Sequence, residues 1–411
     1  MSKHEDETTP GGISGLTQYM RRLEVADRRI ILATVFLLMF GLIMVYSASS
    51  AQYGLSMLRK QAFIGAAGFV GMLIMSYVDY HRWIKWAGAL YIVAFISLFL
   101  VMIRGLGVSK NGANRWIEIR GISVQPSEFM KPVIVIVLAY MMVEMGRNLA
   151  GLRGIIVSML PAIAAVGVIY KVTDNLSTAL IVMGIAVVMF FVAYPDKRIW
   201  ILVGVAVAAA GIFAYYYYQH VVVPSHYAQD AENFRAGRIL AWLYPDEYSE
   251  LSMQSRYSLY AIGFGGLLGR GLGSGTMKYY IPEASNDFIF AVIGEELGLV
   301  GCAMVIFMFV YLVWRIVKIA RHANDKIGGM MAAGIAAHIA LQVILNIGVA
   351  TRVLPNTGIS LPMISYGGTA LLIQMMEIGL VLNISRQIPG RRVAAEGSTQ
   401  GRRENRRVRS A

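Results

Sequence analysis

Ten apolar runs dominate the sequence, and they constrain its fold more than any other feature. They occupy residues 30–48, 61–78, 86–103, 129–145, 154–170, 176–194, 199–219, 288–314, 328–350 and 360–385. A helix that crosses a bilayer needs about 20 predominantly apolar residues. Only 15% of the residues are charged, against about 25% in soluble domains, so a soluble enzyme is excluded. The runs predict an all-α polytopic membrane protein with ten transmembrane helices.

The placement of Lys and Arg predicts the orientation. If the N-terminus is cytoplasmic, most of the 37 basic residues fall on the cytoplasmic side, as the positive-inside rule requires. Both termini are then cytoplasmic: an N-terminal tail (1–29) and a basic C-terminal tail (386–411) flank the ten-helix domain (30–385). One large loop (220–286), between the seventh and eighth helices, is extracytoplasmic. The arginines of the C-terminal tail are expected to face anionic lipid, and no nucleic-acid partner is expected.

Several kinds of site are disfavoured by the motifs. The glycine-rich stretch 261–275 matches neither common nucleotide-binding pattern and is interpreted as turns and close backbone approach. The histidines are scattered, so a zinc site is not expected. The single cysteine, Cys302, excludes an intrachain disulfide and is expected to be buried. The aromatic residues within 220–286 and 104–128 indicate loops that pack against the membrane domain.

Ionisable residues beside or within the apolar runs are the remaining candidates, because charge in a membrane is costly and usually functional. Asp287 directly precedes the run 288–314, where it is either a helix cap or a functional carboxylate. Glu295 lies about 80° further round that helix, where it could share a cavity with Asp287; it is also expected to belong to a structural or supporting ion pair. Glu128 and Lys131, three residues apart, are expected to share a helix face as a structural or supporting ion pair. Lys171, Asp174 and Glu377 are further candidates for buried charge. Glu296 lies on the opposite face of the helix from Asp287 and is expected to pair with another group.

Four segments carry a resemblance to a known family. They are GLIMVYSAS (41–49), NGANRWIEIRGISVQPSEFMKP (111–132), GLGSGTMKYYIPEASNDFIFAVIGEELGLVG (271–301) and LPNTGISLPMISYGGTALL (354–372). With the ten-run layout, they resemble the SEDS family (shape, elongation, division and sporulation), the FtsW/RodA/SpoVE group of bacterial cell-wall polymerases.

The resemblance implies a peptidoglycan glycosyltransferase that polymerises lipid II into glycan strands at the outer face of the cytoplasmic membrane. The growing glycan is then linked to undecaprenyl diphosphate, which is also the leaving group. A class B penicillin-binding protein is the implied transpeptidase partner, together with divisome or elongasome proteins. Matching the family motifs implies a catalytic role for Asp287 and substrate binding by Arg115, Trp116, Lys131 and Arg238.

Two positions depart from the family pattern. Ser285 and Asn286 stand where the family usually has His-Thr before the aspartate. Asn175 replaces the acid of the family's Gln-Pro-Asp-Leu-Gly-Thr segment, and whether the neighbouring Asp174 substitutes for it stays open.

The chemistry of transfer agrees with this resemblance. Glycosidases need a second carboxylic acid to protonate a poor leaving group, whereas a diphosphate leaves without one when cations stabilise its charge. The sequence identifies no definite cofactor, and a divalent cation (Mg²⁺ or Mn²⁺) with Asp287 as a ligand stays open as an alternative.

Three other functions stay open at this point: a lipid II flippase or transporter, a scaffold, and an elongation- or sporulation-type polymerase. The 29-residue N-terminal tail and the arginine-rich C-terminal tail favour a division-type enzyme at the septum.

Overall fold

The computed structural model describes three parts of the chain. They are residues 27–194 except 104, 111–112 and 120–121, then positions 198, 200, 204, 205, 209, 212, 213 and 216, and residues 234–388. The predicted helix 199–219 and both predicted tails lie largely outside the described residues.

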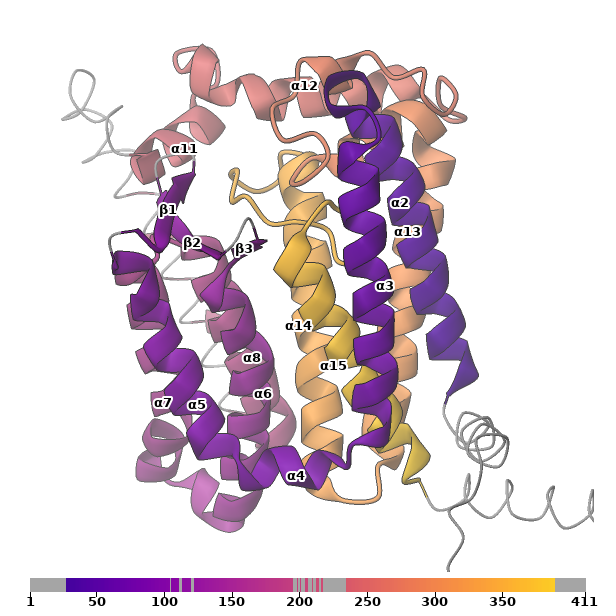
Figure 1. Ribbon diagram of the computed structural model, residues 1–411. Coiled ribbons are helices and arrows are strands. Elements are labelled where there is room, and N and C mark those ends of the chain that lie inside the picture. The colour runs from indigo at the N-terminus through magenta and orange to yellow at the C-terminus, as the bar shows by residue number, and fades with distance from the viewer. Residues whose placement is uncertain are drawn as a thin grey trace, which may run out of the picture.

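Long apolar helices form an upright bundle (Figure 1). Within the described residues, seven helices are long and apolar enough to cross a membrane. They are α2 (Arg28–Tyr53), α3 (Ser56–Tyr77), α7 (Leu152–Val172), α8 (Leu176–Ala193), α13 (Ile289–His322), α14 (Lys326–Ala350) and α15 (Gly368–Arg386). The prediction of an all-helical membrane-spanning domain is therefore confirmed.

Two further helices correspond to the predicted crossings 86–103 and 129–145. The first is α5 (Ala87–Ser97), which continues as the 3₁₀ helix η1 (Leu98–Met102), and the second is α6 (Pro126–Met145). The short elements α4 (Tyr80–Lys85) and η2 (Gly146–Ala150) lie beside them. Cys302 is buried, as expected from its apolar surroundings.

The described part of the long loop 220–286 is largely helical. It contains α11 (Phe234–Leu243), α12 (Ser249–Gly265) and the 3₁₀ turn η5 (Met277–Tyr279). Helix α12 lies across one end of the bundle, and α2 begins and α15 finishes at the opposite end (Figure 1). The first and last spanning helices thus have their outer ends at the same end of the bundle. The predicted topology, with both termini on one side of the membrane, requires this.

A small sheet stands in the loop 104–128, where composition predicted no strands. It consists of β1 (Gly107–Lys110), β2 (Ala113–Ile119) and β3 (Ile122–Val124) in antiparallel order β1-β2-β3. The strands are too short for the alternation of polar and apolar residues to be recognised in the sequence. The sheet adds β structure to an otherwise helical chain and lies at the same end of the bundle as α11 (Figure 1).

Helix α13 is interrupted at Gly298, where the backbone has φ 66°. The glycine-rich loop after α12 packs into this break: Leu299 N–H donates to Gly266 O (3.0 Å), and Arg270 N–H donates to Glu295 O (3.0 Å). A Cβ added to Gly298 would lie 2.4 Å from the carbonyl oxygen of Leu267. The interpretation as turns and close backbone approach is confirmed for 266–275, whereas residues 261–265 form the last turn of α12.

Candidate active site

Side chains from α14 and the loop before α15 hold the backbone at Asp287. The buried Asn346 amide donates to Asp287 O (2.8 Å) and to Ile359 O (2.6 Å). Ser365 Oγ donates to the carbonyl oxygen of Asn286 (2.6 Å). These bonds fix the segment that carries the carboxylate without using the carboxylate itself.

The Asp287 side chain does not cap α13. That helix begins at Ile289 with Phe288 as its N-cap, and no side chain makes the capping bond. Instead the carboxylate approaches Gly358: a Cβ built there would lie 3.3 Å from Asp287 Oδ2 and 3.9 Å from Arg238 Nη1. Gly358 has φ 68°, so a larger residue there would be strained as well as crowded. The carboxylate and the guanidinium therefore approach the same point.

Two arginines from separate elements supply positive charge. Arg238, on α11, donates to Asn356 O (3.3 Å). Arg115, on β2, donates to the carbonyl oxygen of Asp174 (2.7 Å). Backbone oxygens thus orient both guanidiniums, which bring two positive charges to this end of the bundle.

The electrostatics couple these groups. Burial, and then the Glu283 charge, raise the pKa of Asp287 to about 6, against the opposing effects of Arg238 and Arg115. Burial and the Arg115 charge lower the pKa of Arg238, against the effect of Asp287. A carboxylate with a pKa near neutrality is suited to accept a proton, because catalytic bases work best with a pKa near the operating pH.

The turn between α7 and α8 contributes backbone to the site. Asn175, at the position of the family acid, caps α8 by accepting from Thr178 N–H (3.0 Å). Asp174 is exposed, has φ 53°, and presents its carbonyl to Arg115. The expectation that Lys171 and Asp174 are buried is wrong. Both residues are exposed, since Lys171 lies in the last turn of α7 and Asp174 in the turn that follows it. Glu377 is buried and pairs with His338 (2.8 Å).

Lys131 is placed differently from the two arginines. Its Nζ lies 2.7 Å from Glu128 Oε2, one turn earlier on α6, and its side chain is only 1% exposed. A lysine that is buried and neutralised in this way offers little to a diphosphate. The geometry therefore favours the structural role for Lys131 over the substrate-binding one.

Trp116 follows Arg115 on β2 and pairs with Val108 on β1. Asn114 pairs with Ser109, so Arg115 is the extra residue at an irregularity in the pairing of β1 and β2, where the strict alternation of side chains is interrupted. The substrate-binding role of Trp116 stays a prediction.

Glu295 and Glu296 hold the loop before Asp287 onto α13. Glu295 accepts from the N–H groups of Thr276 (2.7 Å) and Met277 (3.0 Å) rather than sharing a cavity with Asp287. Glu296 pairs with the buried Lys278 (2.8 Å). The sequence patterns did not identify Lys278 as a partner of Glu296. Its position in the family segment 271–301, shortly before Asp287, was the available signal.

Within the described chain, no group of three or more His, Cys, Asp or Glu residues could hold a metal ion. The cations that the structure places near Asp287 are Arg238 and Arg115. A divalent cation with Asp287 as a ligand stays a prediction, since Mg²⁺ at phosphate sites is often held by one carboxylate together with the substrate.

Comparison with known proteins places this site in a family context. Residues 28–389 match the family of cell cycle proteins FtsW, RodA and SpoVE. Stage V sporulation protein E of Bacillus subtilis is 36% identical over 368 residues, covering 88% of this chain and 97% of that protein. The probable peptidoglycan glycosyltransferase FtsW of Trichlorobacter lovleyi is 37% identical over 373 residues, covering 89% of this chain and 94% of that protein.

Solved structures show the same fold. A chain from a peptidoglycan synthase complex that coordinates polymerization and crosslinking superposes with a TM-score of 0.72 at 24% identity, covering 89% of this chain and 98% of that one. The rod shape determining protein RodA of Thermus thermophilus gives a TM-score of 0.64 at 23% identity, with the same coverage of both chains.

Proposed function

The chain belongs to the FtsW/RodA/SpoVE family and is a peptidoglycan glycosyltransferase, and we propose that Asp287 is its general base. The substrate is lipid II, which the enzyme polymerises into glycan strands. The observation that carries the proposal is the Asp287 carboxylate, which approaches the same point as the Arg238 guanidinium. Its pKa is raised by burial and lowered by the charges of Arg238 and Arg115. We place the end of the bundle that α12 covers, and with it the candidate site, on the extracytoplasmic side of the membrane.

The reaction is an inverting displacement. The 4-hydroxyl oxygen of the acceptor sugar bonds to the anomeric carbon of the lipid-linked donor, while its proton passes to the Asp287 carboxylate. The bond from that carbon to the diphosphate breaks, and its electron pair goes to the diphosphate oxygen. Arg115 and Arg238 stabilise the charge that develops there. Because a stabilised diphosphate leaves without protonation, one carboxylate is enough.

The pH dependence of polymerisation tests the base. Asp287 must be ionised to accept a proton, so kcat/KM should rise with pH through about 6 and then level off. Glu283→Gln removes a negative charge that raises the pKa of Asp287, so the rise should move to lower pH. The measurement is the initial rate of glycan formation from lipid II by purified protein between pH 4.5 and 8.

Glu250→Gln, an exposed change on α12, is the matched control and should leave the profile in place. A Glu283→Gln profile that coincides with the wild-type profile would count against the proposed electrostatics.

We further propose a division role at the septum, with a class B penicillin-binding protein as partner. The support is the FtsW relatives, of which the one from Coxiella burnetii is 34% identical over 372 residues, together with the two tails seen in the sequence. The sporulation relative matches equally well, so a direct test is needed.

If the chain acts in division, a fluorescent fusion to it should gather at midcell in dividing cells. Even distribution along the side wall would contradict the division role.

A further inference from the structure

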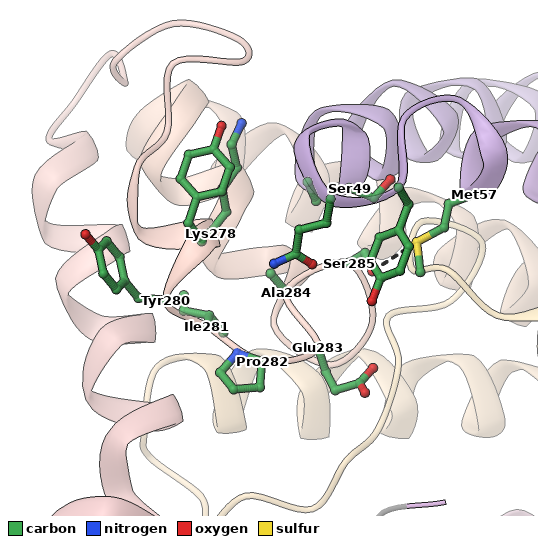
Figure 2. Close-up of a pocket in the computed structure, with 13 residues that line it drawn as sticks. Ser49, Met57, Lys278, Tyr280, Ile281, Pro282, Glu283, Ala284 and Ser285 are labelled. Carbon is green, nitrogen blue, oxygen red and sulfur yellow. Dashed lines mark hydrogen bonds between the residues drawn. The ribbon is translucent and has the colours of Figure 1, made fainter.

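A cavity of about 370 Å³ lies beside the segment that leads to Asp287 (Figure 2). Its walls come from the C-terminal end of α2, the start of α3 and residues 278–285. The volume falls within the range of about 300–1,000 Å³ that is common for sites of small ligands. Glu283 and Ser285, which also line the cavity, are four and two residues before Asp287.

The lining has the chemistry of a saccharide site. Ser49, Gln52, Tyr53 and Tyr280 line the cavity and bring neutral groups that both donate and accept hydrogen bonds, with two aromatic rings among them. A sugar presents many hydroxyl groups, which need partners of this kind. Glu283 adds a carboxylate to this lining, so the cavity matches a polyhydroxylated group that carries no negative charge.

A diphosphate is a poorer match for this cavity. Among the lining residues that the structure describes, the one cation is Lys278. Its Nζ is bound by Glu296 Oε1 (2.8 Å) and by the carbonyl oxygen of Gly273 (3.1 Å). Since this lysine is buried and neutralised, the cavity presents no available positive charge.

The cavity and the two arginines belong to elements on different sides of the bundle. Arg115 and Arg238 come from β2 and α11, whereas the cavity is formed by α2 and α3. These two pairs of elements stand at opposite sides of the bundle (Figure 1). An inverting displacement needs this arrangement, because the attacking oxygen and the leaving group lie on opposite sides of the donor carbon.

We propose that this cavity is the subsite for the acceptor saccharide. The inference rests on the proposed function and refines it: the diphosphate of the donor lies at Arg115 and Arg238, and the acceptor sugar lies between α2, α3 and residues 278–285. From there its 4-hydroxyl loses its proton to Asp287 as its oxygen bonds to the donor carbon.

A donor-only substrate separates the two subsites experimentally. Lipid II that carries a galactose on its terminal 4-hydroxyl can donate but cannot accept. Mixed with ordinary lipid II, it yields a capped product whose initial rate is measured while each substrate is varied in turn. The variants are Tyr53→Ala and Gln52→Leu, both at exposed side chains, so neither change disturbs the core.

Each variant should raise the half-saturating concentration of ordinary lipid II by about 2- to 10-fold, the effect of one or two lost hydrogen bonds. The half-saturating concentration of the capped donor should stay unchanged. Tyr46→Ala, an exposed change on the same helix outside the cavity, should alter neither value. Arg238→Ala should instead raise the value for the capped donor.

The outcomes distinguish the two levels of the proposal. If the wild-type protein makes no capped product, the proposed function fails and the subsite fails with it. If the wild-type protein is active, but Tyr53→Ala and Gln52→Leu leave the value for ordinary lipid II unchanged or shift the value for the capped donor, only the acceptor subsite is overturned.

Discussion

Replacing Asp287 with Asn is expected to lower the rate of lipid II polymerisation by about 10²- to 10⁴-fold, the usual contribution of a general base. Asparagine matches the aspartate in size but cannot accept the proton of the attacking hydroxyl. The measurement is the initial rate of glycan formation by purified D287N protein at pH 7.5, where the wild-type carboxylate is ionised.

The structure indicates that this variant will still fold. The contacts that hold residue 287 use its backbone carbonyl, which accepts from Asn346, and its side chain does not cap α13. D287N should therefore elute as a monodisperse protein with a thermal midpoint close to the wild-type value. A folded D287N protein that polymerises at a near wild-type rate would refute the role of Asp287 as the base.

Lys131→Met is expected to cost about 3–5 kcal/mol of unfolding free energy, because it leaves the buried Glu128 carboxylate without its cation. The double variant Glu128→Gln/Lys131→Met removes both charges and should recover much of that loss. The measurement is unfolding in detergent, compared with Lys171→Met. That exposed change should alter stability by no more than about 0.5 kcal/mol.

The alternative for Lys131 is direct contact with the donor diphosphate. It predicts a stable Lys131→Met protein whose half-saturating donor concentration is raised. That combination would contradict the structural role assigned here.

The membrane-spanning helices could be predicted because an apolar run of sufficient length has few alternatives in a bilayer. The sheet at 107–124 and the break at Gly298 could not. The strands are too short for a hydropathy pattern, and the break depends on the loop after α12 packing against α13. Both features arise from tertiary contacts that no local pattern encodes.

The candidate site shows the same limit. The Glu128–Lys131 pair follows from a spacing of three residues on one helix. The pair Lys278–Glu296 joins a loop to a helix, and Asn346 reaches Asp287 across 59 residues of sequence. The family resemblance identified Asp287 and Arg238 separately; only the fold brings them to the same point beside Gly358.

Polymerisation of pure lipid II by the purified chain alone, with no other polymerase present, tests the glycosyltransferase function directly. We expect glycan strands from the wild-type protein and only trace product from D287N at equal amounts of folded protein. A flippase or a scaffold would make no glycan in this assay. The absence of strands from folded wild-type protein would contradict the glycosyltransferase function, and equal amounts from both proteins would contradict the role of Asp287.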